Sequence, residues 1–247
     1  MRWIYLSPHL DDAALSAGGL IYDQTQAGTP VEIWTFMCGD PRLAEYSKFA
    51  SKLHADWGFA DAEETVRERR LEDRRAAEIL GARVEHFDFL DCIYRRGPDG
   101  AWLYKEIAIP PLPADADLPA QIASAITPRL LPDDVLVCQL AVGSHVDHVI
   151  VRMAAELLGR PLVYDIDIPY LFYKPEEFEP KAAGLEEKTQ RISEAGLERW
   201  QEAVLAYKSQ LPVLGEALST PEATRESIRS YWEEWKGIRL LHRVTEA

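Results

Sequence analysis

The chain has 247 residues, of which 47% are hydrophobic and 28% charged, and its formal charge is −14. This composition suits one large or two small globular domains with a sizeable core. The acidic balance argues against partners bound by neutralising phosphates, such as duplex DNA or an anionic membrane surface, and no apolar run approaches the ~20 residues of a membrane span.

Five short β-rich runs alternate with longer helical patterns. The runs lie at 2–7, 31–38, 83–89, 134–140 and 161–166, and we predict buried parallel strands there. The helices predicted from apolar spacings of three and four span 13–26, 61–80, 118–130 and 146–158. Asp61 and Glu64 resemble a capping box, and Gly81 is well placed to end the same helix. This alternation predicts an α/β fold with a Rossmann-like doubly wound, mostly parallel sheet in three α/β/α layers.

The remaining segments are less regular. Prolines, glycines and aspartates between Arg95 and Asp117 predict a long surface loop. Beyond Glu176 the chain is charged, and we predict one amphipathic helix over 184–207 and another over 220–235. We expect one domain over 1–247, with an α/β core over 1–170 and a helical C-terminal extension over 175–247 packed on it.

The three cysteines indicate the redox state of the protein. Cys38, Cys92 and Cys138 are odd in number, far apart and set in apolar runs, which argues against a disulfide framework or a CxxC metal site. We therefore expect reduced core residues. Because the apolar runs are too short for a membrane span and WIYL is too short for a signal-peptide core, we expect a cytoplasmic protein, and the acidic charge predicts no nucleic-acid partner.

Two polar clusters follow predicted strands. His9, Asp11 and Asp12 come just after the first strand, and GSHVDH, residues 143–148, follows the fourth. Open parallel sheets bind ligands beyond the carboxyl ends of their strands, so both clusters should face one crevice. Two imidazoles and a carboxylate converging there predict a divalent-metal site, because catalytic zinc commonly takes three nitrogen or oxygen ligands.

Each cluster alone has a simpler explanation. Asp11 or Asp12 could only cap the following helix. His145 and His148 could share a helix face or satisfy backbone groups, and Asp147 between them could orient one histidine or be a solvated or capping residue. Two independent clusters at corresponding strand ends favour the metal site.

The joint pattern resembles the LmbE-like, or PIG-L, family of zinc-dependent N-acetylglucosamine deacetylases. The pieces that match are PHLDD before a small-residue helix with paired glycines, HVDH downstream, Arg69-x-x-Glu72, FLDC with Asp91, and YKSQ at 207–210. The resemblance implies a hydrolase that removes the acetyl group from a small-molecule N-acetylglucosamine-type sugar conjugate. Its cofactor would be zinc, with iron left open.

The resemblance also implies roles at the metal. His9, Asp12 and His148 would be the ligands, and Asp11 would be the general base acting on metal-bound water. A metal lowers the pKa of bound water towards ~7, so a nearby carboxylate can take its proton at neutral pH.

Further roles concern the substrate. An amide leaves poorly, and by resemblance His145, as imidazolium, would stabilise the oxyanion and help to protonate the departing amine. Arg69 and Asp91 would hold sugar hydroxyls. Two positions depart from the family pattern: Leu10 replaces a proline, and Ala13 replaces a glutamate that braces the site. Neither change removes a proposed ligand or the base.

Other functions stay open. One is a non-catalytic sugar- or metabolite-binding protein that keeps the fold and metal, although the presence of Asp11 argues for catalysis. Another is a metal hydrolase of a different bond, although two-metal phosphoesterases usually need more ligands. The sequence leaves open the group attached to the sugar and the formation of a homo-oligomer. We expect substrate selection by residues 40–60, the 95–117 loop and the C-terminal helices.

Overall fold

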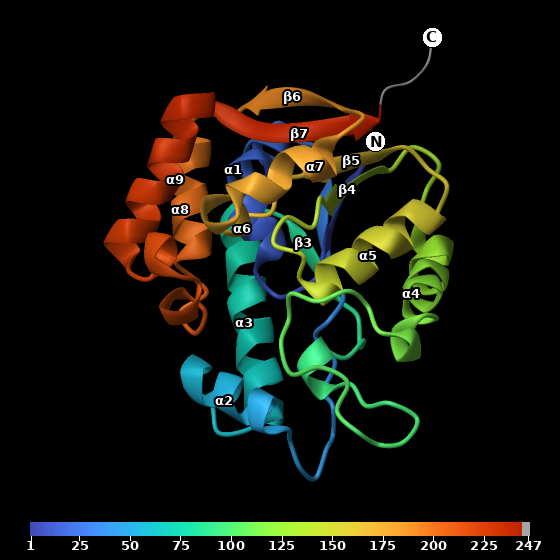
Figure 1. Cartoon of the computed structure of the whole chain (residues 1–247). Coiled ribbons are helices and arrows are strands. Elements are labelled where there is room, and N and C mark those ends of the chain that lie inside the picture. Colours follow the sequence, from blue (N-terminus) through green and yellow to red (C-terminus); the bar gives the residue numbers. More distant parts are fainter. Residues whose placement is uncertain (244–247) are drawn as a thin grey trace.

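A seven-stranded sheet forms the centre of the protein. The computed structural model describes residues 1–243, and the strand order is β3-β2-β1-β4-β5-β7-β6 (Figure 1). Strands β1 to β5 are parallel, whereas β7 runs antiparallel to both β5 and β6. The strands are β1 (Trp3–Ser7), β2 (Val31–Thr35), β3 (Arg83–His86), β4 (Val135–Gln139), β5 (Leu162–Asp165), β6 (Leu185–Arg191) and β7 (Gly237–Arg243).

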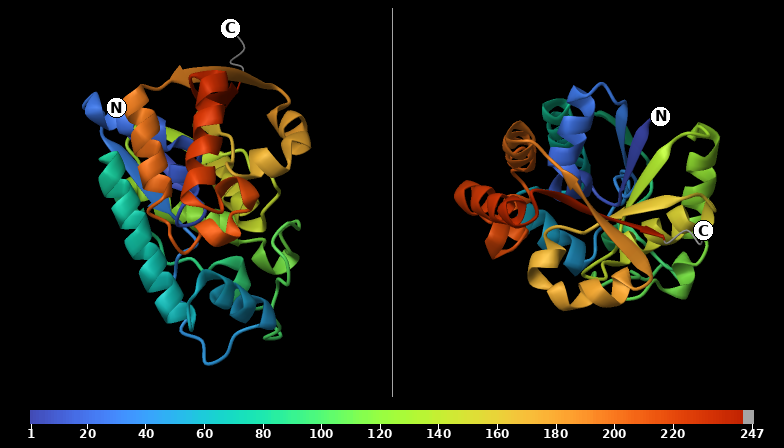
Figure 2. Two further views of the ribbon diagram at one scale, coloured as in Figure 1. Left: turned by 90° about the vertical axis from the view of Figure 1, so that its left-hand side faces the viewer. Right: turned by 90° about the horizontal axis from the view of Figure 1, so that it is seen from above.

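Helices cover both faces of the sheet. Their bounds are α1 (Asp12–Gln26), α2 (Lys48–Trp57), α3 (Ala62–Leu80), α4 (Leu118–Ile126), α5 (Val146–Leu157), α6 (Tyr170–Tyr173), α7 (Phe178–Ala182), α8 (Glu194–Val204) and α9 (Pro221–Trp235). Helices α1, α3, α8 and α9 lie on one side, and α4 and α5 lie on the other (Figures 1 and 2). The predicted three-layer α/β/α fold is confirmed.

Strand alternation explains why two cores form. Ile4 and Leu6 of β1 point into the core beneath α4 and α5, whereas Tyr5 points into the core beneath α1 and α8. The caps of α3 follow the prediction as well: the Asp61 carboxylate accepts a hydrogen bond from the backbone of Glu64, and Gly81 ends the helix with φ of 73°.

The strand order places a switch point between β1 and β4. The chain runs outward from β1 through β2 to β3 and then returns to the other side of β1 with β4. The loops that leave the carboxyl ends of β1 and β4 therefore diverge to opposite faces and leave a crevice between them. Both polar clusters of the sequence lie in these two loops.

The prediction of one helix over 184–207 is wrong in its first half. Residues Leu185–Arg191 form strand β6, which pairs with β7, and only Glu194–Val204 are helical. The LEEKTQR run has helix-forming residues but lies exposed at the sheet edge, where its charges discourage pairing with another chain. Gly237 permits this pairing, because a Cβ there would lie 2.1 Å from the carbonyl oxygen of Gln190. The C-terminal segment is thus not purely helical.

Three smaller predictions can be compared with the structure. The segment 95–117 is irregular apart from a short 3-10 turn at Pro113–Asp115, as expected. Cys38, Cys92 and Cys138 are buried and free. Within residues 1–243, none of the helices has the length and apolar character needed to cross a membrane.

Candidate active site

The loop between β1 and α1 is held by its own hydrogen bonds. The Ser7 hydroxyl donates to the carbonyl of His9 at 2.7 Å and accepts from the backbone N–H of Ala13 at 3.1 Å. The backbone N–H of His9 donates to the Asp12 carboxylate at 2.7 Å. Asp11 occupies the N-cap position of α1, but its side chain makes no capping hydrogen bond. Helix capping therefore explains neither aspartate.

The loop between β4 and α5 carries the second cluster through a tight turn. Ala141 and Ser144 adopt positive φ values of 62° and 56°. At Gly143 a Cβ would come within 2.2 Å of the Tyr170 ring, so this position has room only for glycine. The turn delivers His145 to the N-cap of α5, where its Nδ1 accepts the backbone N–H of Asp147 at 3.1 Å.

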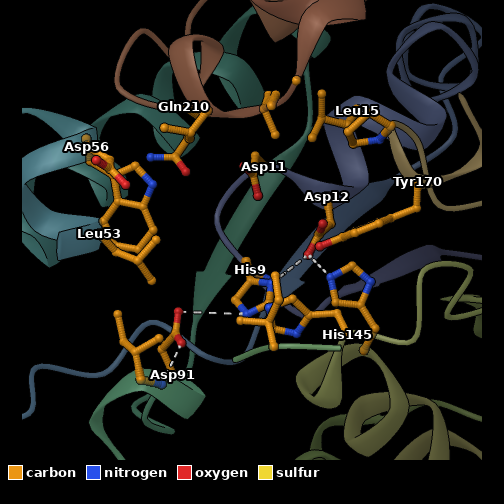
Figure 3. A pocket seen from close by; sticks show the side chains of 18 of the residues that line it. His9, Asp11, Asp12, Leu15, Leu53, Asp56, Asp91, His145, Tyr170 and Gln210 are labelled. Atoms are coloured by element: carbon orange, nitrogen blue, oxygen red, sulfur yellow. Dashed lines mark hydrogen bonds and ion pairs between the residues drawn. The ribbon is translucent and has the colours of Figure 1, made fainter. Parts of the chain in front are cut away.

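The donors predicted to bind metal lie together. Asp12 Oδ2 is 3.3 Å from His9 Nδ1 and 3.4 Å from His148 Nε2. One ring nitrogen from each of His9, His145 and His148 lies within 4.8 Å of the other two. The cluster is buried at the floor of a cavity (Figure 3).

Buried carboxylates hold the far nitrogens of both candidate histidine ligands. His9 Nε2 is 3.1 Å from Asp147, and His148 Nδ1 is 2.9 Å from Asp167. Such contacts fix the ring orientation and direct the remaining nitrogen, Nδ1 of His9 and Nε2 of His148, toward Asp12. Two nitrogens and a carboxylate oxygen braced in this way fit a divalent cation such as zinc.

The electrostatics of the cluster favour positive charge at its centre. Burial alone would lower the pKa of His9, but Asp12 and Asp147 hold that pKa well above its ordinary value. Burial alone would raise the pKa of Asp12, but His148 and His9 keep it well below the usual range. Asp12 is therefore an anion at neutral pH, as a metal ligand must be.

Asp11 has a different environment. Its carboxylate points into the cavity near His9 and Asp12 (Figure 3). One of its oxygens lies 3.6 Å from Arg69 Nη2. Burial raises the pKa of Asp11 to about 6, while the Arg69 guanidinium opposes that shift. The Arg69 guanidinium also lies 4.9 Å from the ring of Trp57. A carboxyl with this pKa can exchange a proton near neutral pH.

His145 is neutral in this arrangement. Burial, together with the neighbouring His9 and His148, lowers the pKa of His145 well below its ordinary value. Because its Nδ1 accepts a backbone hydrogen bond, the neutral ring carries its proton on Nε2. The imidazolium that the resemblance implies is not the form this geometry favours.

A cavity of about 560 Å³ opens above the cluster, and most of its wall is apolar. Asp91 and Gln210 join the metal-site residues among its polar groups (Figure 3). Arg69 lines the cavity as well. The apolar wall includes Phe49, Leu53, Trp57, Ile107, Tyr173 and Leu214. Two of the regions expected to select substrate, residues 40–60 through α2 and the 95–117 loop, contribute to this wall. The C-terminal side of the wall comes from α6 and the segment between α8 and α9, not from the C-terminal helices themselves.

Sequence reasoning missed several functional contacts. Asp167 was not singled out, although it follows the strand β5 as the other clusters follow β1 and β4, and that position was the available signal. Asp147 is expected to orient His145 or His148, or to be solvated or capping, but its fully buried side chain contacts His9 instead. The YKSQ motif anchors the C-terminal region to α3, since Tyr207 donates to Asp73 at 2.8 Å.

Comparisons with known proteins agree with this geometry. The sequence model of the PIG-L family, described as GlcNAc-PI de-N-acetylase, matches residues 4–158. A zinc-inhibited form of a teicoplanin deacetylase is 28% identical with a TM-score of 0.83, over 100% of both chains. A deacetylase–teicoplanin complex is 26% identical with a TM-score of 0.82, over 98% of this chain and 97% of that one. The A40926 pseudoaglycone deacetylase is 28% identical with a TM-score of 0.73, over 99% of each.

No match was found among curated proteins. The family match nevertheless spans the β1–α1 loop with its His9 cluster and reaches past the His145 cluster at the start of α5. The solved structures extend the likeness over the C-terminal strands and helices. The chain belongs to the PIG-L, or LmbE-like, family.

Proposed function

We propose that this protein is a zinc-dependent hydrolase that removes the acetyl group from an N-acetylglucosamine-type sugar conjugate. The observation that carries the proposal is the pairing of a braced His–Asp–His donor set with an Asp11 carboxylate that caps no helix and faces the cavity. Family membership and the deacetylase structures support the same reaction.

The metal would be held by His9 Nδ1, Asp12 and His148 Nε2. When bound, zinc supplies a Lewis acid for the acetyl carbonyl and lowers the pKa of water towards ~7. Zinc suits two nitrogens and one oxygen, and iron would suit them too. We propose zinc as the divalent metal.

The chain's own groups would move the protons. Asp11 takes a proton from the attacking water and, as a carboxylic acid with a raised pKa, returns it to the departing amine nitrogen. His145 donates its Nε2–H to the carbonyl oxygen as negative charge develops there. In this scheme His145 acts as a neutral hydrogen-bond donor.

Substrate recognition would divide between two walls of the cavity. Arg69 and Asp91 are proposed to bind sugar hydroxyls beside the metal. The apolar wall of Phe49, Leu53 and Trp57 would bind an apolar or aromatic group attached to the sugar. The neighbouring deacetylase solved in complex with teicoplanin supports a conjugate of this kind.

Two alternatives fit the site less well. A non-catalytic binding protein would have no use for Asp11, which is buried beside the donor set and makes no capping hydrogen bond. A two-metal hydrolase of another bond would need a second complete donor set in addition to His9, Asp12 and His148.

We also propose a cytoplasmic location, which the three free thiols support, and no nucleic-acid partner.

The test is amine and acetate release from two substrates, free N-acetylglucosamine and its aryl β-glycoside, with zinc-loaded protein. We expect turnover of both and a lower KM for the aryl glycoside. Trp57→Ala should raise the KM for the aryl glycoside about tenfold, equal to about 1.4 kcal/mol of binding, and should raise the KM for the free sugar by less, because the Trp57 ring also packs on Arg69. The control is Trp102→Ala, which removes a tryptophan that stacks on Arg96 outside the cavity. Zinc-loaded protein that releases no amine from either substrate would contradict the proposal.

A further inference from the structure

Arg95 is a buried arginine between two buried carboxylates. It is 7% exposed, with Nη2 at 2.6 Å from Asp147 and Nε at 2.9 Å from Asp115. These contacts are ion pairs whose N–H bonds are not aligned as hydrogen bonds. Its Nη1 donates to the Leu90 carbonyl at 3.1 Å, and its guanidinium lies 5.1 Å from the Tyr104 ring. The side chain thus has one fixed position.

Asp147 uses its two oxygens for different purposes. Oδ1 contacts Arg95, whereas Oδ2 accepts the backbone N–H of Cys92 at 3.0 Å and lies 3.1 Å from His9 Nε2. The residue is 0% exposed, so water cannot replace any of these partners. The orientation of the carboxylate plane is therefore set jointly by Arg95 and Cys92.

That orientation matters for the proposed metal ligand. A carboxylate on the far nitrogen of a histidine ligand fixes its tautomer and its ring, and loss of such a contact typically weakens metal binding 10- to 100-fold. A buried carboxylate that loses its cationic partner must find new compensation or turn away. Removing Arg95 would therefore loosen Asp147, and through it His9.

We propose that Arg95 is a positioning residue that sets the affinity of the site for its divalent cation by holding Asp147 against His9. Asp115, whose carboxylate also accepts the Tyr104 hydroxyl at 2.6 Å, anchors the other edge of the guanidinium in the 95–117 loop. The loop that lines the cavity is thereby tied to the metal site. This inference rests on the proposed function, since it assumes that His9 is a ligand.

The test is the zinc dissociation constant of the purified full chain, measured by competition with a chromophoric chelator. Arg95→Gln should weaken zinc binding about 10- to 100-fold. At saturating zinc its KM should stay within twofold of wild type, because Arg95 does not line the cavity. Arg95→Lys keeps the charge without the planar fork and should recover part of the affinity.

The matched control is Arg152→Gln. Arg152 is also partly buried, donates to the Leu140 carbonyl at 2.8 Å, pairs with Glu156 and lies 5.1 Å from the Tyr164 ring. Its loss should lower the melting temperature and leave zinc affinity unchanged. If Arg95→Gln lowers only the melting temperature, Arg95 is a structural brace and the inference fails.

Two results separate this inference from the proposed function. If wild-type protein binds no zinc, the proposed function fails first. If wild-type protein binds zinc and the Arg95 variants bind it equally well, only the role of Arg95 is lost. Should Arg95→Gln not fold, Arg95→Lys decides the matter, because unchanged zinc affinity in that variant would contradict the inference and weaker affinity would support it.

Discussion

Asp11 is a buried carboxylate whose surroundings suit proton transfer. It accepts no capping hydrogen bond, and burial raises its pKa to about 6 against the opposing effect of Arg69. Asp11→Asn should lower kcat about 10²- to 10⁴-fold, the usual contribution of a general base. Zinc content, measured by mass spectrometry, should stay at the wild-type level, because Asp11 is not a proposed ligand. Loss of zinc in Asp11→Asn would instead make Asp11 part of the metal site.

The raised pKa of Asp11 predicts how kcat/KM depends on pH. A base must be ionised, so kcat/KM should rise with pH as Asp11 loses its proton, at a pH below about 6 because the bound cation favours the carboxylate. Arg69 lowers this pKa, and therefore Arg69→Gln should move the acidic limb of the profile to higher pH. The profile is measured at saturating zinc. An acidic limb that does not move in Arg69→Gln would contradict the electrostatic role of the Asp11–Arg69 pair.

At the scale of elements, the sequence predicts those helices and strands whose formation depends on the local residue pattern. Apolar periodicity and caps predict strands β1 to β5 and helices α1, α3, α5 and α9. The two polar clusters, at His9–Asp12 and at residues 143–148, are predicted from their positions after strands. Strand β6 was missed because LEEKTQR has no strand pattern of its own and is ordered by pairing with β7. Arg95 was missed for a related reason, since its partner Asp147 lies far away in sequence, whereas Asp167 could have been found from its position after β5.

The contact of α1 with α8 gives a prediction at this scale. A Cβ on Gly19 would lie 2.5 Å from the Ile192 side chain and 3.2 Å from the carbonyl oxygen of Gly196. Gly19→Ala should therefore lower the free energy of unfolding by about 1–3 kcal/mol, the range for an overpacked core. In an uncrowded helix, replacing glycine by alanine raises the free energy of unfolding by about 1 kcal/mol. Chemical denaturation of Gly19→Ala measures this free energy, and the sign of its change tests whether α1 and α8 are in contact. If Gly19→Ala instead raised the free energy of unfolding, α1 and α8 would have to lie further apart than in this structure.

At the scale of the whole molecule, the switch point joins distant parts of the chain in one site. The metal-site side chains come from the β1–α1 loop, the β4–α5 loop and Asp167, which follows β5. The cavity wall comes from α2, the 95–117 loop and the C-terminal region. The segment from 175 shares the sheet through β6 and β7. That residues 1–247 form one domain stays a prediction.

This arrangement predicts that metal stabilises the entire fold. The donors lie far apart in sequence, so the unfolded chain cannot reproduce the site, and a ligand at 100 times its dissociation constant stabilises the native state by about 2.7 kcal/mol. For a chain of this size that corresponds to a rise in melting temperature of about 5–10 °C, measured by scanning calorimetry of chelator-treated protein with and without zinc. In His148→Ala the rise should largely disappear. It should also shrink in wild type as pH falls, because protons compete with zinc for the donor set. A zinc effect that persists in His148→Ala would locate the cation at other residues and remove the basis for the ligand set.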